Sequence, residues 1–333
     1  MDPVKIAVVG VGHLGRHHAR LLAENPRADL VGVADARQDA VDQSVEKLGC
    51  FGTTDFHELA DRVEAVSVAV PTGRHRDVAG FFLEKGVDVL VEKPITPTVE
   101  EGRELCDLAK KHDRILQVGH IERFNPAFQA LREKAIQPRY VEAERLAPFT
   151  FRSTDIGVVL DLMIHDIDLV RQLIGSEVES VQAYGGAVFT PAEDMSCAIL
   201  KFENGAVANL TASRAAMKAV RKMRVFSKDG YASIDFNERQ GVLIRKGEGW
   251  DIGKLDLASV DTTKIQDLWK FVFDGLLTVQ EYKAEMTNPL DEELTAFLEC
   301  VRTRQEPEVS GEAGLRAVEV AHQVVEAIRA HPW

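Results

Sequence analysis

Cysteine is scarce in this 333-residue chain, and long hydrophobic runs are missing from it. The four cysteines lie far apart, so no C-x-x-C pair indicates a metal knuckle or a redox motif, and we expect reduced thiols. No stretch of about 18 apolar residues predicts a membrane span. The first apolar run is broken by Lys5, which is atypical of a signal peptide. These absences favour a cytoplasmic protein without a membrane partner.

Basic residues are outnumbered by acidic ones. The chain has 40 Lys and Arg against 53 Asp and Glu, which gives a formal net charge of −13 and a pI near 5.3. This balance argues against a nucleic-acid partner, because phosphate backbones would be repelled. With 45% hydrophobic and 28% charged residues the chain has enough apolar material for buried cores, and its length favours two domains.

The first 120 residues alternate short apolar runs with helical patterns, an order typical of an α/β domain with a parallel sheet. The runs are rich in Val, Ile and Leu, as expected for strands buried on both faces. A capping box, Thr98-x-x-Glu101, predicts the start of one helix. The predicted strands are Val4–Val9, Asp29–Ala34, Ala65–Val70, Val87–Val91 and Ile115–Val118.

From about Arg139 the pattern changes to strands separated by hairpin signals such as Asn204-Gly205, which predict an antiparallel sheet. We therefore assign residues 1–120 to an α/β domain with a parallel sheet. Residues 121–333 are assigned to an α+β domain with an open antiparallel sheet. The predicted strands are Val181–Val188, Ser196–Phe202, Ala206–Thr211, Met223–Phe226 and Tyr231–Phe236. The predicted helices are Val159–Ile174, Leu290–Arg304 and Gly314–Ala330, of which the last two can pack back on the first domain; no structure is predicted for residues 246–285.

The motif Gly10-x-Gly12-x-x-Gly15 directly follows the first predicted strand and opens a helix. In a dinucleotide-binding domain the first glycine allows a tight turn, the second lets the backbone approach a pyrophosphate, and the third lets the helix pack on the strand. The phosphates then lie at the helix N-terminus. The alternative is a glycine-rich turn without a ligand. We expect the loop, with His13 and Leu14, to bind a dinucleotide.

Asp35 ends the second predicted strand. A carboxylate at this position would hydrogen-bond the adenosine ribose hydroxyls and would repel a 2′-phosphate. NAD is therefore predicted over NADP. Arg37, two residues further on, can partly accommodate that phosphate and leaves the choice open.

Two polar motifs follow the third and fourth long strands, Pro71-Thr72-Gly73-Arg74-His75 and Glu92-Lys93-Pro94. Ligands of open α/β sheets bind at the carboxyl ends of the strands, so we expect both motifs at the cofactor crevice. Partial burial and a nearby cationic nicotinamide would lower the pKa of Lys93 and make it an acid or base near neutral pH. The plainer interpretation is a solvated lysine. The candidate cofactor-binding residues here are Pro71, Thr72, His75, Glu92 and Lys93.

Asp161, His165 and Asp168 are spaced i, i+4 and i+7 on the predicted helix Val159–Ile174, which places them on one stripe. Two carboxylates beside one imidazole can raise its pKa and orient it as an acid/base partner. The plainer interpretation is the solvated face of an amphipathic helix. Because no further His or Asp cluster completes a ligand set, we predict no metal site.

Together these motifs resemble the glucose–fructose oxidoreductase, inositol dehydrogenase and rhizopine catabolism (Gfo/Idh/MocA) family, and the similarity extends to Glu293 and Gly311-Glu312 near the end. The resemblance implies NAD(P) on an N-terminal Rossmann domain and a substrate on the face of the C-terminal sheet. It also implies that Lys93 anchors and protonates the reacting oxygen, with Asp161 and His165 around the reacting carbon.

Two segments, Gly119–Pro126 and Asp161–Asp168, resemble one branch of the family, the UDP-N-acetylglucosamine or UDP-GlcNAc-uronate 3-dehydrogenases. Arg123 and Arg152 are cations able to pair with a diphosphate, and Asn125 can hydrogen-bond sugar hydroxyls or an acetamido group. The alternative for Arg123 is a surface arginine or a domain-interface ion pair.

The sequence thus predicts an NAD-dependent dehydrogenase that oxidises a sugar CH–OH group, C3 of a UDP-N-acetylated hexose, by hydride transfer to nicotinamide. The alternatives are a dehydrogenase of a free sugar or a polyol such as inositol, and a non-catalytic NAD(H)-binding regulator. Retention of Lys93 and His165 argues against the regulator. Relatives pair through an apolar face of the second sheet, so we expect a homodimer or homotetramer.

Overall fold

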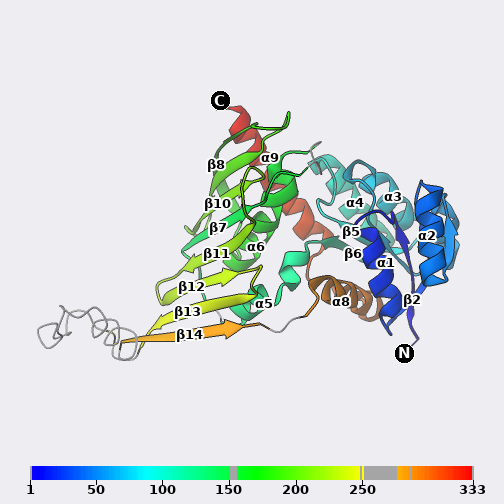
Figure 1. The fold of residues 1–333 in the computed structure, drawn as a ribbon, viewed down its shortest axis with the longest axis horizontal. Coiled ribbons are helices and arrows are strands. Elements are labelled where there is room, and N and C mark those ends of the chain that lie inside the picture. Colours follow the sequence, from blue (N-terminus) through cyan, green and yellow to red (C-terminus); the bar gives the residue numbers. More distant parts are fainter. Residues whose placement is uncertain are drawn as a thin grey trace, which may run out of the picture. The chain divides into compact units, whose positions relative to one another are not determined.

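The computed structural model describes residues 2–134, 136–150, 156–247, 250, 276–284 and 287–331. The chain divides into two compact units. Unit 1 comprises Met1–Phe124 and Thr287–Gln323, and unit 2 comprises Asn125–Met286 and Val324–Trp333. Each unit is built around its own sheet (Figure 1).

Unit 1 contains a six-stranded parallel sheet in the order β3-β2-β1-β4-β5-β6. From β1 the chain adds β2 and β3 on one side of the sheet and β4 to β6 on the other, so the strand order reverses between β1 and β4. Ligands of such sheets bind at this point. All five predicted strands are present, and the short β3 is an addition. The strands are β1 (Val4–Val9), β2 (Ala28–Ala34), β3 (Phe51–Thr53), β4 (Ala65–Val68), β5 (Asp88–Glu92) and β6 (Leu116–Gly119).

Helices cover this parallel sheet, and their ends follow the local sequence. The Thr98 side chain accepts a hydrogen bond from the backbone N–H of Glu101 at 3.3 Å, so the predicted capping residue starts its helix. Leu294, Phe297 and Leu298 of the late helix α8 are fully buried in the core of unit 1. The elements are α1 (Gly15–Glu24), α2 (Gln38–Leu48), α3 (His75–Glu84), α4 (Val99–His112), α8 (Pro289–Thr303), and the 3-10 segments η1 (Phe56–Arg62), η2 (Thr72–Arg74) and η3 (Ile121–Phe124).

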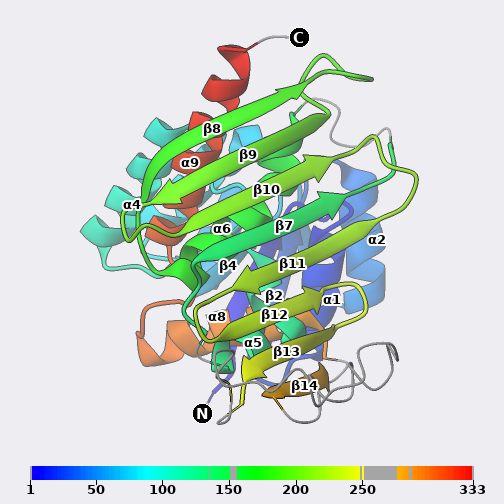
Figure 2. The same cartoon turned by 90° about the vertical axis from the view of Figure 1, so that its left-hand side faces the viewer.

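Unit 2 contains an eight-stranded sheet in the order β14-β13-β12-β11-β7-β10-β9-β8 (Figure 2). The sheet is mostly antiparallel, as predicted, but β7 pairs with β10 in parallel. Strands β7, β13 and β14 were not predicted. The strands are β7 (Tyr140–Leu146), β8 (Val178–Gly186), β9 (Met195–Phe202), β10 (Val207–Ser213), β11 (Val220–Phe226), β12 (Gly230–Asp235), β13 (Gln240–Lys246) and β14 (Leu277–Lys283).

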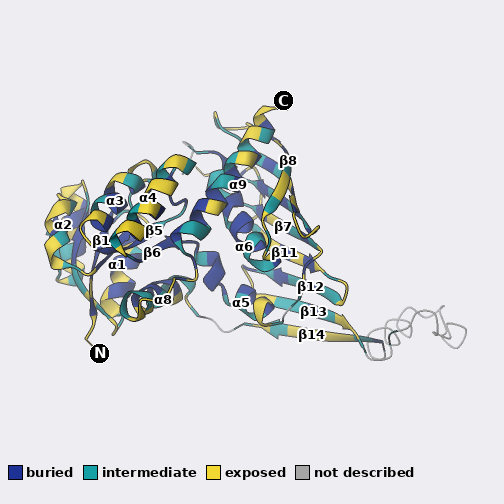
Figure 3. Cartoon of the chain, turned by 180° about the vertical axis from the view of Figure 1, so that it is seen from behind, coloured by how far each residue is buried: buried dark blue, intermediate teal, exposed yellow. Residues whose placement is uncertain are grey.

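One face of the unit 2 sheet packs against α5 (Pro126–Glu133) and α6 (Ile164–Ile174), and Figure 2 looks onto the other face. Residues along the strands alternate between buried and more exposed positions (Figure 3). A buried ion pair joins strand to helix: Nε and Nη2 of Arg145 on β7 each lie 2.9 Å from a carboxylate oxygen of Asp166 on α6. The last helix, α9 (Gly311–Arg329), contains the boundary between the two units.

The predicted helix Val159–Ile174 has two parts. Its first turn, Val159–Met163, is π-helical, and the α-helix α6 begins at Ile164. A π-turn holds more residues per turn than an α-helix, so the spacing rule used on the sequence does not apply across it. Among the described residues, no helix is long and apolar enough to cross a membrane.

Candidate active site

The glycine loop after β1 has the geometry that a dinucleotide requires. Gly10 has φ +88°, and a Cβ there would lie 2.7 Å from the carbonyl oxygen of Ala69. A Cβ on Gly15 would lie 1.7 Å from the carbonyl oxygen of Gly10, so the helix start is packed against the turn. A Cβ on Gly12 would meet nothing within 4 Å. The second glycine therefore borders open space, into which a pyrophosphate can approach the backbone.

That space belongs to a groove of about 890 Å³ at the carboxyl ends of the unit 1 strands. This size suits an adenosine with its phosphates, since ligand pockets span about 300–1,000 Å³. Of the predicted cofactor-binding residues, the groove is lined by Gly10, Gly12, His13, Leu14, Asp35, Arg37 and Pro71.

The Asp35 carboxylate lies at this groove and braces the glycine loop. Its Oδ2 accepts a hydrogen bond from the backbone N–H of Val11 at 2.9 Å, and its Oδ1 accepts one from the backbone N–H of Arg37 at 3.0 Å. The Nε of Arg37 lies 3.5 Å from Oδ1. The carboxylate and the guanidinium that act oppositely on a 2′-phosphate are thus side by side.

Several groove residues were missed by the sequence reasoning. Thr54, Asp55 and Phe56 line the groove just after the short strand β3. Three residues are too few for an alternating or continuous apolar pattern, so β3 gave no periodic signal. The polar run Thr53-Thr54-Asp55 was the available cue.

Five predicted cofactor residues are not part of the groove lining: Gly15, Thr72, His75, Glu92 and Lys93. Thr72 starts the segment η2. His75 is buried, with Nδ1 3.0 Å from the carbonyl oxygen of Pro94 and Nε2 3.0 Å from that of Val70. Burial lowers the pKa of His75, against weaker opposing effects of these hydrogen bonds, and so favours the neutral ring. The neutral ring has one N–H, so it donates to one of these carbonyls and lies close to the other, between the end of β4 and the turn after β5.

Glu92 and Lys93 lie where β5 ends. Lys93 is partly buried. The Oε1 of Glu92 is 3.0 Å from Nε2 of His18, and its Oε2 accepts a hydrogen bond from the backbone N–H of Lys93 at 3.2 Å. Burial alone would raise the pKa of Glu92, but the hydrogen bond from His18 and the charges of His18, Lys93 and His75 together lower it. The carboxylate form is therefore favoured beside Lys93.

The polar stripe in unit 2 differs from the prediction. Asp168 is fully buried, while Asp161 and His165 are partly buried, so the plainer interpretation of a solvated face is wrong. Asp161 lies on the π-turn, and its Oδ2 is 3.8 Å from Nη2 of the buried Arg214. Arg214 also lies 3.8 Å from the buried Asp194. Arg214 was not predicted as a site residue. It directly follows β10, and nothing in the local sequence shows that this arginine is buried.

The three predicted contacts to a nucleotide sugar have different outcomes. Arg123 is buried on η3, and its Nη1 donates to the carbonyl oxygen of Glu308 at 2.7 Å. Asn125 caps α5, accepting from the backbone N–H of Ala127 at 3.1 Å. Arg152 lies outside the described residues. The structure thus gives Arg123 and Asn125 protein partners. Within the described ranges, no group of three His, Cys, Asp or Glu residues is placed to hold a metal ion.

A parallel sheet with its glycine loop, acidic strand end and groove, followed by a second domain, defines a nicotinamide-dependent oxidoreductase. The family described as "Oxidoreductase family, NAD-binding Rossmann fold" (GFO_IDH_MocA) matches residues 4–120, and the GFO/IDH/MocA C-terminal domain matches residues 134–233. The chain belongs to the Gfo/Idh/MocA family. The predicted family and the predicted enzyme class, a nicotinamide-dependent dehydrogenase, are confirmed.

Two named relatives cover 99% and 75% of the chain. UDP-N-acetylglucosamine 3-dehydrogenase from Acidithiobacillus ferrooxidans is 36% identical over 333 residues, with 99% of each chain covered. A solved structure of the enzyme of that name and organism superposes with a TM-score of 0.88, covering 99% of each chain at 36% identity. The scyllo-inositol 2-dehydrogenase (NAD(+)) of Bacillus subtilis is 30% identical over 75% of this chain and 79% of its own length.

Proposed function

We propose that this protein is an NAD-dependent dehydrogenase that oxidises C3 of a UDP-N-acetylated hexose, UDP-N-acetylglucosamine or its uronate. The observation that carries the proposal is the 36% identity to UDP-N-acetylglucosamine 3-dehydrogenase over 99% of both chains. The relation to the inositol dehydrogenase is weaker and covers three quarters of this chain. It supports the alternative of a free sugar or polyol substrate.

NAD is the proposed cofactor because the Asp35 carboxylate lines the groove beside the glycine loop. A carboxylate there favours two ribose hydroxyls and repels a 2′-phosphate. The bound nicotinamide supplies the acceptor for the substrate's hydride. The glycine loop holds the dinucleotide through its backbone, and Asp35 holds it through its carboxylate.

Lys93 is the proposed acid/base residue. Oxidation of a hydroxyl releases a proton as well as a hydride, because loss of the hydride alone would leave a protonated carbonyl of high energy. Lys93 follows directly on β5 at the ligand-binding edge of the sheet. We assign proton uptake to its Nζ, and assign to His165 and Asp161 the binding of the sugar or the relay of that proton.

Replacing Lys93 by methionine tests this assignment. Lys93→Met removes the ammonium but keeps an unbranched apolar stem, so turnover of UDP-N-acetylglucosamine should fall by about 10²–10⁴-fold. NAD affinity, measured by calorimetry, should stay within about twofold, because the loop and Asp35 hold the dinucleotide. The matched control is Lys85→Met, at the C-terminal end of α3. Near-normal turnover of Lys93→Met on the accepted substrate would refute the mechanism.

The substrate is tested with the unaltered protein. Initial rates with NAD are compared for UDP-N-acetylglucosamine, its uronate, free N-acetylglucosamine and scyllo-inositol. The proposal predicts turnover of a UDP-sugar and at least about a tenfold lower kcat/KM for the free compounds, since loss of diphosphate contacts removes charge-assisted hydrogen bonds. Preference for scyllo-inositol would establish the alternative.

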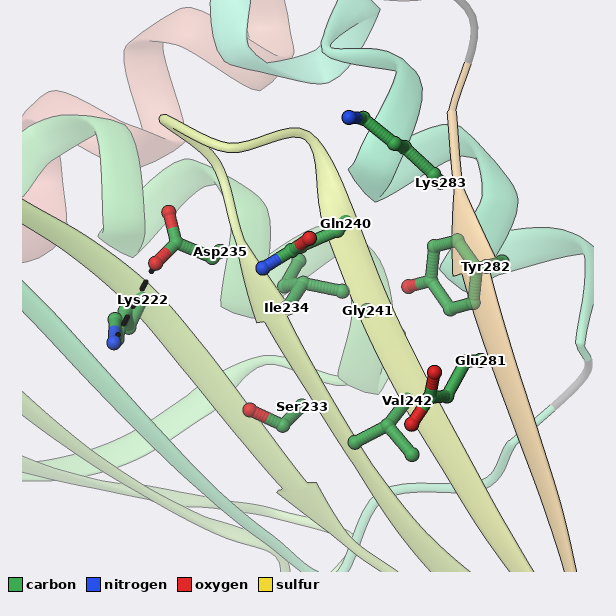
Figure 4. Close-up of a pocket in the computed structure, with 10 residues that line it drawn as sticks. All are labelled: Lys222, Ser233, Ile234, Asp235, Gln240, Gly241, Val242, Glu281, Tyr282 and Lys283. Carbon is green, nitrogen blue, oxygen red and sulfur yellow. Dashed lines mark ion pairs between the residues drawn. The ribbon is translucent and has the colours of Figure 1, made fainter.

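The face of the unit 2 sheet seen in Figure 2 is the proposed contact between two copies of the chain. It exposes Tyr184, Ile199 and Phe226. It also carries charges of both signs, including the ion pair of Lys222 with Asp235 at 3.4 Å beside the hollow of Figure 4. Apolar residues among mixed charges suit a two-fold contact with an identical face. Light scattering of a concentration-independent 36.8 kDa monomer would contradict the proposal.

A further inference from the structure

A chain of buried polar groups lies behind the Glu92-Lys93 turn in unit 1. His18 of α1 is fully buried, and its Nδ1 lies 2.8 Å from the Oγ of Ser67 on β4. Its Nε2 lies 3.0 Å from Oε1 of Glu92, whose other oxygen accepts the backbone N–H of Lys93. Gly119 on β6 leaves the room: a Cβ there would lie 3.1 Å from the Glu92 carboxyl carbon. One carboxylate therefore connects α1 to the backbone of Lys93.

We propose that His18 is a positioning residue for Lys93: it clamps the Glu92 carboxylate, and through it the strand-end turn, to helix α1. The inference deepens the proposed function, because it takes Lys93 as the acid/base residue. Lys93 has a long flexible stem, so the placement of its Nζ depends on where its backbone is fixed. A misplacement of about 1 Å at a reacting group can cost about 10²-fold in rate.

The clamp also links Lys93 to the cofactor loop. Helix α1 begins at Gly15, the last glycine of that loop, and His18 lies one turn inside it. The dinucleotide phosphates are expected at the N-terminus of the same helix. A single rigid element therefore carries both the phosphate cradle and the residue that fixes the Glu92-Lys93 turn.

A second carboxyl group, Glu293 of α8, constrains the charge of this cluster. Glu293 is fully buried, and neither of its oxygens has a hydrogen-bond partner among the residues that the structure describes. Burial, and then the charge of Glu92, raise the pKa of Glu293 well above its usual value. Protonation of Glu293 is therefore favoured, while Glu92 tends to keep its charge. If Glu293 ionised, a second buried negative charge would compete for His18 and loosen the clamp.

Among the residues that the structure describes, no basic side chain makes a hydrogen bond to the Glu293 carboxyl group. The neighbours of α8 are α1, β1 and η3. Helix α1 contributes His18, which is engaged by Glu92. Segment η3 contributes Glu122 and Arg123, and the guanidinium of Arg123 donates to the carbonyl oxygen of Glu308. From β6, Gln117 donates to the backbone oxygen of Glu293 at 3.3 Å and not to its carboxyl group.

The clamp is tested with two substitutions of His18, one without a hydrogen-bond donor and one with an amide donor. His18→Leu removes both ring nitrogens, whereas His18→Gln keeps an amide N–H that can reach the Glu92 carboxylate, whose Oε1 lies 3.0 Å from Nε2 in the wild type. We expect kcat to fall by about 10–100-fold in His18→Leu and to recover at least about tenfold in His18→Gln, with NAD affinity within about twofold throughout. Equal kcat in the two variants and the wild type would overturn the proposal.

A substrate-free measurement separates the clamp from the proposed function. The Lys93 N–H is protected by Glu92 Oε2. Hydrogen exchange of the peptide around Glu92-Lys93 in the cofactor-free protein should therefore speed up in His18→Leu and be slow again in His18→Gln. Unchanged exchange overturns the clamp. If exchange behaves as expected but Lys93→Met retains turnover, the proposed function fails and the clamp stands as a structural device.

Glu293 gives an independent readout should His18→Leu fail to fold. The ratio of kcat in Glu293→Gln to kcat in the wild type should rise by at least about threefold from near-neutral pH to the alkaline limit at which both proteins stay folded, because only the wild type can acquire a second buried charge. The control is Glu292→Gln, the same chemical change at the exposed neighbouring position, whose ratio should stay flat. A flat ratio for Glu293→Gln would overturn the part assigned to Glu293.

Discussion

Replacing Glu293 by glutamine also tests whether the buried carboxyl group is neutral in the folded protein. The substitution keeps the side chain's shape and removes its titration. Burial, and then the charge of Glu92, raise the folded pKa of Glu293 well above 4.5. The folded protein therefore holds a proton that the unfolded chain releases above about pH 4.5. The stability of the wild type must fall as the pH rises from the unfolded pKa towards the folded pKa.

The expected magnitude follows from proton linkage. Within that window each pH unit lowers the free energy of unfolding of the wild type by about 1.4 kcal/mol relative to Glu293→Gln. Below that window, where the folded and the unfolded wild type are both protonated, the two proteins should differ least. Between about pH 5.5 and about pH 7.5 the gap should widen by up to about 2.7 kcal/mol in favour of the glutamine.

The assay must report on unit 1. Trp250 belongs to unit 2, and Trp269 and Trp333 lie outside the described residues, so tryptophan fluorescence is not a reporter of unit 1. Native-state hydrogen exchange of the slowest amides of β4 and β5, compared between variants at the same pH, gives the free energy directly. Glu292→Gln is the control. A gap that stays constant or narrows with rising pH would refute the reasoning, because it would mean that Glu293 is ionised in the folded protein.

Two further predictions concern cofactor choice and the stability of unit 2. The wild type should bind NAD more tightly than NADP, and Asp35→Ser should narrow the difference by about tenfold, because the charge that repels a 2′-phosphate is removed; calorimetry showing equal or tighter NADP binding by the wild type would contradict this. Asp166→Asn should lower the stability of unit 2 by about 3–5 kcal/mol, since Arg145 would be left buried without its anion. Breaking the exposed pair with Lys222→Met should cost less than about 1 kcal/mol, and native-state hydrogen exchange of the slowest amides of β10 and β11 measures both changes.

The order and type of most elements could be predicted because their patterns are simple. Strands such as β1 and β5 are buried on both faces and so appear as continuous apolar runs. Strand β7 escaped because its inward position 145 is an arginine. Its partner, Asp166, lies 21 positions away on a helix, and no local pattern reveals such a pair. Arg145, which breaks the apolar alternation of β7, is also the residue that links β7 to α6 through its ion pair with Asp166.

The polar stripe on the helix Val159–Ile174 shows a second limit. Its i, i+4, i+7 spacing assumed 100° per residue, but the first turn is π-helical up to Met163. Asp168, expected on the same face as Asp161, is instead fully buried. A π-turn depends on tertiary contacts around it, so the local sequence gives no warning of it.

Motif spacing also does not separate the residues that touch a ligand from those that hold such residues in place. Gly10, Gly12 and Asp35 line the groove, as expected. His75 belongs to an equally good motif, yet its ring joins the carbonyl oxygens of Val70 and Pro94. A histidine between two strand-end carbonyls fixes the distance between two loops and has no ring nitrogen left for a ligand. Glu92 likewise contacts His18 and the backbone of Lys93, and we assign its effect on the reaction to the lysine turn that it holds.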